Sequence, residues 1–218
     1  MNIIFNKNKF VLNPDGSMFW PKESCLIVGD LHLEKSTSYI DQGNFLPPYD
    51  TLETLSKLSF AIKEKCIKKI IFLGDVFHDC NGYKRLKLKE KNLFDNILNK
   101  NIIWISGNHD ANFIPTGIDS FILYKLNKFT FSHISSSKNS YEISAHYHPK
   151  VTFKYLGIKI SSPCFLIDKY KIILPAYGSY TGGLNISSNI FKKIFSRNFN
   201  IYALGNKKVL RVNNLNLK

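Results

Sequence analysis

The stretch IIWISGNHDAN, residues 102–112, joins an apolar run to a polar cluster, and the fold predicted for the chain depends on it. Its first five residues are typical of a buried β-strand, and the glycine after them indicates a tight turn. An amide, an imidazole and a carboxylate follow at once, at Asn108, His109 and Asp110. A turn accounts for the glycine and the asparagine. It gives no reason for the histidine and the aspartate, which therefore indicate a site where a core strand ends.

Two more apolar runs of this kind precede the stretch, and a helical pattern follows each of them. Strand and helix alternate over residues 24–30, 49–65, 68–75, 88–100 and 101–110. In the first helix, Asp50 is expected to be the N-cap, with Glu53 three residues on to complete a capping box. The alternation indicates βαβ units, and therefore parallel strands with helices packed against them.

The chain before and after these units has short strand-like runs separated by turns. Expected features are a turn over residues 13–16, turns at Leu156-Gly157 and Asp168-Lys169, a short helix over 188–195 and a last hairpin around Asn206. This layout predicts an α/β protein in which two sheets share one core and helices lie outside. We expect one domain, residues 1–218, with a motif core over 25–150. The C-terminal strands and short helix, 151–218, are expected to complete the second sheet.

The composition is that of a folded protein. At 218 residues and 44% hydrophobic, the chain can bury a full core. No apolar run approaches the roughly 20 residues that span a bilayer, and the N-terminal residues do not resemble a secretory signal. The four cysteines are scattered, which indicates reduced thiols, with Cys25 and Cys164 as small core residues. A cytoplasmic protein without a membrane partner is expected.

The formal net charge of +14 is consistent with binding to nucleic acid. Lysine supplies nearly all of this charge, and lysine, asparagine and isoleucine are frequent together, as in coding sequence biased toward A and T. Sites that bind phosphate often use arginine, because its planar fork matches the phosphate oxygens. The charge therefore attracts polyanions without indicating which ones.

Polar side chains gather after each of the three apolar runs, and two more clusters follow later. In an open α/β sheet the carboxyl ends of the strands meet at one edge, where ligands bind. The chain has six histidines, and all of them lie in these clusters. One buried histidine is more often a core residue, but six in such places indicate a site. The clusters are Asp30 with His32; Asp75 with His78 and Asp79; Asn108 with His109 and Asp110; His133; and His146 with His148.

Two clusters have ligand-type residues two positions apart. Such residues project the same way on an extended segment, so Asp30 with His32, and His146 with His148, are suitable ligand pairs. Imidazole, carboxylate and amide ligands suit first-row transition metals better than a thiolate or an all-oxygen site would. The ligands are too many for one ion. Two ions about 3.5–4 Å apart with a shared carboxylate are a recurring solution for phosphate ester hydrolysis.

The ordered set D-x-H, G-D-x-x-H, G-N-H-D, H and H-x-H, within residues 29–149, resembles the calcineurin-like metallophosphoesterase superfamily. The segments DLHLEKSTSY, LPPYDTLETL, LGDVFHD, GNHD and LPAYGSYTGGL are similar to those of DNA-ligase-associated metallophosphoesterases, which are treated as DNA-damage-response endonucleases. The resemblance implies a four-layer αββα sandwich of two mixed sheets flanked by helices. It also implies two divalent transition-metal ions, with manganese expected and iron, zinc or nickel as alternatives.

The resemblance gives each matching residue a role. It implies one metal held by Asp30, His32 and His148, the other by Asn108, His133 and His146, and Asp75 as the ligand that bridges both. The catalytic group it implies is His109, which would face the phosphate without binding metal. Beside it, His78 would help to seat the phosphate, so that Asn108, His109 and His78 would contact the substrate. We expect Asp110 to orient His109 or its loop.

The chain departs from the family pattern at two positions. The usual glycine before H-x-H is Ala145, and the residue after His133 is Ile134. Alanine in place of glycine costs little free energy unless the backbone needs a positive φ. These departures therefore bear on the conformation of the two loops and leave the predicted metal ligands unchanged.

Two loops have two interpretations each. The glycines of LPAYGSYTGG, residues 174–183, could form a backbone nest for a phosphate, or the loop could pack beside the site. The serine-rich residues between His133 and Glu142 are expected to be a surface loop, with Lys138 as an alternative substrate contact.

The implied reaction is attack of a hydroxide, formed from water with the help of the two cations, on a phosphodiester in DNA. A role in DNA repair, with a functional link to a DNA ligase and helicase, is part of the resemblance. One alternative is a phosphodiesterase or phosphomonoesterase for small molecules such as cyclic nucleotides, which present the same phosphoryl centre. Another is a scaffold without turnover, but such a chain would have lost ligands. The sequence does not indicate the oligomeric state or the choice between endonuclease and exonuclease.

Overall fold

The structure is a computed structural model, and it describes residues 1–40, 43–110, 113–136, 140–155, 158–195 and 198–212. Among these residues the strands form two mixed sheets. The first contains seven strands in the order of the chain: β1 (Asn2–Phe5), β2 (Asn8–Leu12), β3 (Met18–Trp20), β4 (Cys25–Val28), β5 (Lys69–Phe72), β6 (Asn101–Ile105) and β7 (Ser120–Phe121).

The second sheet contains eight of the described strands, in the order β15-β14-β12-β13-β10-β9-β8 with β11 beside β12. Their bounds are β8 (Leu123–Leu126), β9 (Phe129–Ser132), β10 (Glu142–Ser144), β11 (Lys150–Tyr155), β12 (Ile158–Ile167), β13 (Lys171–Ile173), β14 (Asn200–Leu204) and β15 (Val209–Val212). The described helices are η1 (Pro21–Glu23), α1 (Lys35–Ile40), α2 (Asp50–Glu64), α3 (Gly82–Arg85), α4 (Leu88–Leu98) and α5 (Asn189–Ile194).

The centre of the first sheet confirms the predicted βαβ units. The strands β4, β5 and β6 are parallel, with Ile27 beside Ile71 and Ile71 beside Ile103. The long helix α2 lies between β4 and β5 in the chain, and α4 lies between β5 and β6. The carboxyl ends of these three strands therefore meet at one edge of the sheet, which is where the first three polar clusters were expected.

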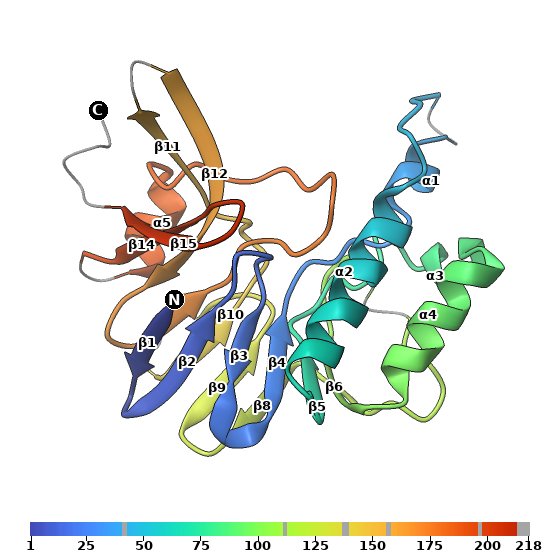
Figure 1. The fold of residues 1–218 in the computed structure, drawn as a ribbon, viewed down its shortest axis with the longest axis horizontal. Coiled ribbons are helices and arrows are strands. Elements are labelled where there is room, and N and C mark those ends of the chain that lie inside the picture. The colour runs from blue at the N-terminus through green and yellow to red at the C-terminus, as the bar shows by residue number, and fades with distance from the viewer. Residues whose placement is uncertain (41–42, 111–112, 137–139, 156–157, 196–197, 213–218) are drawn as a thin grey trace.

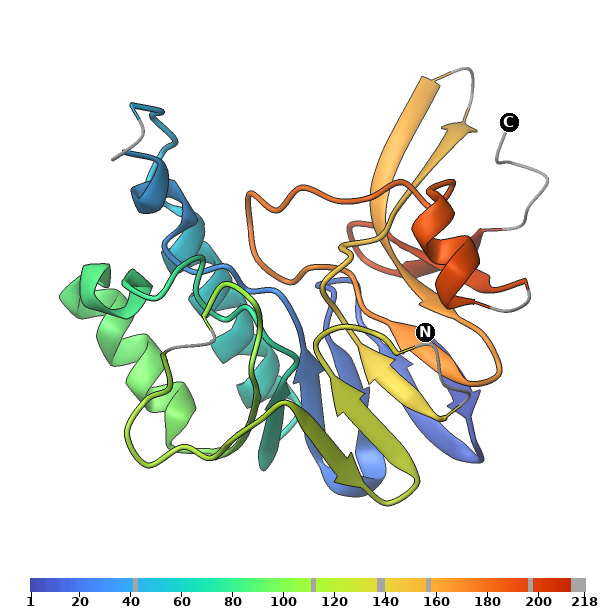
Figure 2. The same ribbon diagram turned by 180° about the vertical axis from the view of Figure 1, so that it is seen from behind.

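The two sheets face each other across a shared apolar core. This core includes Ile27 and Ile71 from the first sheet and Phe131 and Ile172 from the second. On the outer face of the first sheet, Leu55 of α2 and Phe94 of α4 pack against the strands. On the outer face of the second, Phe191 of α5 packs beside Cys164. Figures 1 and 2 show α2 and α4 on one side and α5 on the other, so the predicted αββα layers are confirmed.

The start of α2 differs from the prediction. Asp50 lies in the first helical turn, and Tyr49 is the N-cap without a side-chain hydrogen bond. The carboxylate of Asp50 instead accepts hydrogen bonds from the backbone N–H of Ser36, at 3.1 Å, and from its hydroxyl, at 2.5 Å. The predicted capping box was wrong because this tertiary contact with α1 takes the carboxylate that would have capped the helix.

The predicted short helix, last hairpin and turn at Asp168-Lys169 are confirmed. The helix α5 begins after Ser188, whose hydroxyl accepts a hydrogen bond from the Ile190 N–H, and β14 and β15 form the last hairpin. The side chain of Asp168 accepts hydrogen bonds from two backbone N–H groups in the turn before β13. The predicted turn at Leu156-Gly157 lies outside the described residues. Among the helices that are described, none has the length and apolar character needed to cross a bilayer.

Candidate metal centre

Seven side chains predicted to bind metal come together at the edge where the strands end. Each follows a strand of one of the two sheets, so the site lies where the sheets meet. Asp30 and His32 follow β4, Asp75 follows β5, Asn108 follows β6, His133 follows β9, and His146 and His148 follow β10. Residues that are more than 100 positions apart in the sequence are thereby brought within contact distance.

The first group of ligand atoms comes from Asp30, His32 and His148. The Nε2 atom of His148 lies 3.3 Å from Nε2 of His32 and 3.5 Å from Oδ1 of Asp30. The carboxylate is completely buried, and its Oδ2 accepts a hydrogen bond of 2.9 Å from the backbone N–H of His146. These three ligand atoms lie within 4.8 Å of one another, as a single ion requires.

The second group of ligand atoms surrounds the Nε2 atom of His133. This nitrogen lies 3.3 Å from Oδ2 of Asp75, 3.0 Å from Oδ1 of Asn108 and 3.0 Å from Nδ1 of His146. The Nδ1–H of His133 donates to the Leu73 carbonyl at 2.7 Å, which orients the ring so that its Nε2 atom faces the other three atoms.

Asp75 lies between the two groups. Its Oδ2 is 3.3 Å from Nε2 of His133 and 3.8 Å from Nε2 of His32, so one oxygen faces both clusters. Its Oδ1 accepts a hydrogen bond of 2.9 Å from the backbone N–H of His109. This is the placement that a bridging carboxylate needs, with one oxygen toward the ions and the other fixed by the protein.

The donor atoms fit divalent transition metals. Oδ1 of Asp30 is buried and has no hydrogen-bond partner among the described residues, although it lies near the ring nitrogens of two histidines. A buried carboxylate oxygen without a partner costs about 1–3 kcal/mol or more, so a cation at this point would remove a real penalty. The nitrogen and oxygen donors match the ligand set that manganese, iron, zinc and nickel accept.

The ligand pairs converge for a different reason from the one predicted. Asp30, His32, His146 and His148 do not lie on extended segments, because their φ angles are 54°, 45°, 70° and 44°. Left-handed backbone at these residues turns the chain sharply. The extended-segment prediction was therefore wrong, although the pairs themselves lie together.

Comparison with known proteins agrees with this architecture. The family model for calcineurin-like phosphoesterases matches residues 24–211 of the chain. The chain belongs to the calcineurin-like phosphoesterase family. It is accordingly a metal-dependent phosphoric ester hydrolase. Members of this family use a dimetal centre.

Two solved structures are similar to this calcineurin-like phosphoesterase. One is the Pseudomonas putida nuclease MPE, with 25% sequence identity and a TM-score of 0.75, over 97% of this chain and 99% of that chain. The other is Yfce, a phosphoesterase from E. coli, with 14% identity and a TM-score of 0.43, over 86% of this chain and 97% of that chain; this similarity is too low to inform the site. No curated protein sequence matches the chain.

Close backbone contacts explain the glycines of this phosphoesterase and one departure from the family pattern. A Cβ at Gly29 would lie 2.4 Å from Cβ of Ala145, and a Cβ at Gly107 would lie 2.0 Å from Oδ1 of Asp75. Ala145 is not among the residues with positive φ, so it needs no glycine there. The methyl group of Ala145 fills the space that Gly29 leaves. The loop after β4 and the loop after β10 can therefore stay in close contact.

Burial and neighbouring charges shift the pKa values of these groups. Burial, with His148 nearby, lowers the pKa of His32 to about 2. Burial also lowers the pKa of His146. Burial alone would raise the pKa of Asp75, yet its hydrogen bond with His133 holds that pKa well below the ordinary value. His32, His146 and Asp75 are therefore unprotonated at neutral pH, as metal binding requires. His133 differs, because burial alone would lower its pKa but its hydrogen bond with Asp75 and the nearby carboxylates raise it.

His78 and His109 form a third cluster with His32 beside the two ligand groups. Nδ1 of His78 lies 3.4 Å from Nδ1 of His32, and the rings of His78 and His109 are stacked at 5.1 Å. The Nδ1–H of His109 donates to the His78 carbonyl at 2.9 Å, so its Nε2 is left for other partners. Burial, followed by the charge of Lys35, lowers the pKa of His78 to about 4. Their predicted roles at the phosphate remain predictions.

Asp110 faces the loops and not the ligand atoms. Its Oδ2 accepts hydrogen bonds from the N–H groups of Val76 and Phe77, and its Oδ1 accepts one from Gly107. Burial raises the pKa of this carboxyl to about 6. The side chain thus ties the loop after β6 to the loop after β5, while its predicted role in orienting His109 remains a prediction. Asp79 belongs to none of the three candidate ligand groups among the described residues, and it pairs with Arg85 at 2.6 Å.

An open cavity of about 440 Å³ lies over the His32, His78 and His109 cluster. Its wall includes Lys35 and Tyr147, which no motif or spacing in the sequence had singled out. Lys35 was present in the family-like segment DLHLEKSTSY, and that is the signal that could have found it. The cavity is large enough for a phosphorylated substrate beside the ligand atoms.

The glycine-rich loop 174–183 packs on the first ligand loop. The N–H of Tyr177 donates to the Gly29 carbonyl and the N–H of Gly178 donates to the Asp30 carbonyl. A Cβ at Gly178 would lie 1.9 Å from the Leu31 carbonyl oxygen, so only glycine fits. The packing interpretation therefore holds for this part, while Gly182 and Gly183 line the cavity. Lys138 lies outside the described residues.

Proposed function

We propose that this phosphoesterase is a DNA endonuclease or phosphodiesterase that acts in DNA repair in the cytoplasm. In this proposal it uses two divalent metal ions, and manganese is the expected metal. The observation that carries the metal-dependent part is the convergence of seven ligand side chains, with Asp75 between its two groups. The DNA substrate is supported by the similarity to a nuclease over nearly the whole chain and by the net charge of +14. A functional link to a DNA ligase and helicase belongs to the same proposal.

The chain's own residues divide the work in the following way. Asp30, His32 and His148 would hold one ion, and Asn108, His133 and His146 the other, with Asp75 between them. When bound by these residues, two ions would supply Lewis acidity that would make a hydroxide available near neutral pH and would offset charge on the phosphoryl oxygens. In this proposal His109 faces the phosphate from the cavity, where a protonated imidazole would give a proton to the leaving oxygen. His78, stacked on His109, would hold a phosphoryl oxygen.

The test is a substrate panel on one preparation, with manganese titrated in. It contains a DNA oligonucleotide, a chromogenic diester and a chromogenic monoester. We expect cleavage of DNA with manganese and a loss of more than about 100-fold in Asp75→Asn. The matched control is Asp79→Asn, which removes a nearby carboxylate that pairs with Arg85 and binds no metal.

Each result of the panel has a defined meaning. If every divalent metal leaves DNA intact while a small ester is hydrolysed, the DNA proposal fails and the small-molecule alternative replaces it. If no substrate is hydrolysed and the purified protein contains no transition metal, the scaffold alternative is correct. Equal loss of activity in Asp75→Asn and Asp79→Asn would contradict the assignment of Asp75.

A further inference from the structure

The β11–β12 hairpin has a face made of lysines and hydroxyl groups. In this antiparallel pair Lys154 lies opposite Lys159, and Thr152 lies opposite Ser161. Side chains two apart on a strand share a face, so Lys150, Thr152 and Lys154 lie on the same side of the hairpin as these partners. We call these five residues, Lys150, Thr152, Lys154, Lys159 and Ser161, the hairpin stripe.

Within the described part of the chain, the two facing lysines of the hairpin stripe have no acidic partner. Lys154 and Lys159 are exposed, and neither belongs to an ion pair among the described residues. Like charges directly opposite each other in an antiparallel pair are destabilising. An anion bound between the two ammonium groups would remove this repulsion, so the stripe is complementary to a negatively charged ligand.

The hairpin stripe begins at the wall of the cavity over the metal centre. The side chain of Lys150 lies about 3 Å from the position of a Cβ on Gly183, which lines that cavity, and its Nζ donates to the Thr181 carbonyl at 3.4 Å. The hydroxyl of Thr152 accepts a hydrogen bond of 3.0 Å from Asn185. The stripe therefore continues outward from residues 181–185, which lie between the site and the hairpin.

The hairpin extends beyond the body of the protein. Figure 1 shows β11 and β12 projecting on one side, α1 on the other and the loop after β13 between them. Lys35, the first residue of α1, also lines the cavity. From Lys150 to Lys154 a strand rises about 13 Å, so the hairpin stripe is long enough to follow a bound nucleic-acid backbone past more than one phosphate.

We propose that the hairpin stripe binds the backbone of the DNA strand beyond the phosphate that is cleaved. This inference rests on the proposed DNA substrate and adds a contact surface outside the metal centre. The lysines would contact successive phosphates and the hydroxyl groups would donate to phosphate oxygens, so binding would not depend on base sequence. A small diester held at the metal centre does not extend along the stripe.

The test uses the full chain with the double substitution Lys154→Gln/Lys159→Gln. Binding of a fluorescein-labelled single-stranded DNA 20-mer is measured by anisotropy at several salt concentrations in EDTA, where no cleavage occurs. Loss of two phosphate contacts should make the slope of log K against log salt less negative by about 1.4. With manganese, kcat/KM for the 20-mer should fall more than kcat/KM for a chromogenic diester.

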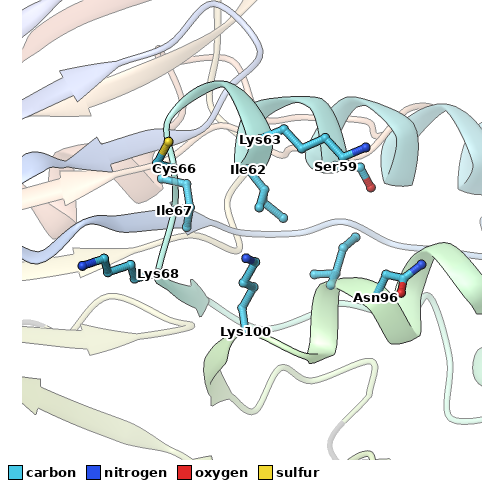
Figure 3. A pocket seen from close by; sticks show the side chains of 9 residues that line it. Ser59, Ile62, Lys63, Cys66, Ile67, Lys68, Asn96 and Lys100 are labelled. Atoms are coloured by element: carbon cyan, nitrogen blue, oxygen red, sulfur yellow. The ribbon is translucent and has the colours of Figure 1, made fainter.

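The matched control removes two lysines at the opposite end of the parallel strands. Lys68 and Lys100 come directly before β5 and β6, at a cleft between the ends of α2 and α4 that Figure 3 shows. The substitution Lys68→Gln/Lys100→Gln makes the same change in net charge. We expect it to leave the salt dependence of DNA binding close to that of the unmodified protein.

The outcomes separate the two proposals. An unchanged slope in Lys154→Gln/Lys159→Gln, or an equal change in the control, overturns the hairpin stripe while DNA cleavage by the unmodified protein stands. Binding with the expected slopes but no DNA cleavage supports the stripe and contradicts the nuclease proposal. An unmodified protein that does not bind the 20-mer in EDTA overturns the hairpin stripe, and one that also leaves DNA intact with every divalent metal overturns both proposals.

Discussion

The Nε2 atoms of His32 and His148 lie 3.3 Å apart, although 116 positions separate the two residues in the chain. One histidine follows a strand of the first sheet and the other follows a strand of the second. The contact therefore forms only when the two sheets pack on each other. A ligand set divided in this way couples metal binding to the complete fold.

Removal of one such ligand should lower the number of bound ions. In His148→Ala the first ligand group keeps Asp30 and His32, while the second group is untouched. We expect metal content to fall from about two ions per chain to about one after dialysis, because one site has lost a ligand. Mass spectrometry of the metals measures this, with Lys100→Gln as the control. Two ions retained in His148→Ala would contradict the assignment.

Removal of His109 should slow the reaction without affecting the metals. Its ring donates to the His78 carbonyl, and its backbone N–H donates to Asp75. The backbone N–H is kept in His109→Ala, so the contact that holds Asp75 is kept too. We expect His109→Ala to lower kcat by about 10²- to 10⁴-fold, the range for a lost general acid. Metal content should stay at the level of the unmodified protein. A matching loss of metal would show that His109 acts on the ligands.

Gly29 and Ala145 should show strong coupling in stability. A Cβ on Gly29 would lie 2.4 Å from Cβ of Ala145, so Gly29→Ala should destabilise the fold by about 1–3 kcal/mol through overpacking. The next nearest atom, Cβ of Leu73, is 3.4 Å away and leaves room for a methyl group. Adding Ala145→Gly should therefore restore much of the loss. Urea unfolding of the two single variants and the double variant measures this, and simple additivity would refute the contact.

The pKa of His32 predicts how metal-free protein responds to acid. Its folded pKa is lowered to about 2 by burial and by His148, whereas an unfolded histidine titrates near 6.5. Below pH 6.5 the unfolded chain therefore binds a proton that the folded chain excludes. His32 contributes stability above pH 6.5, and this contribution is lost as the pH falls, by at most about 1.4 kcal/mol per pH unit.

The variant His32→Asn isolates this contribution from the other titrating groups. Between pH 6.5 and 5, in EDTA, the free energy of unfolding should fall more steeply for the unmodified protein than for His32→Asn. Urea unfolding at pH 7.5, 6 and 5 measures both slopes. Parallel curves would mean that His32 is protonated in the folded protein.

The sequence was sufficient for the parts of the site that depend on strand ends. Glycine followed by a ligand after each apolar run places Asp30, Asp75 and Asn108 at one edge, because parallel strands require it. It was insufficient where tertiary contacts decide. The carboxylate of Asp50 binds Ser36 and does not cap its helix, and Lys35 reaches the cavity only because α1 packs there. Local pattern cannot predict either contact, since both join segments that the fold brings together.

The left-handed backbone at Asp30, His32, His146 and His148 has an evolutionary consequence. Residues with a Cβ pay roughly 1–2 kcal/mol each for this conformation, while glycine adopts it freely. Glycine at these four positions would relieve the chain and abolish the ligands at the same time. Substitutions to glycine that raise stability at these positions would therefore lower activity. Selection for turnover is needed to keep imidazole and carboxylate side chains at positions where the backbone favours glycine.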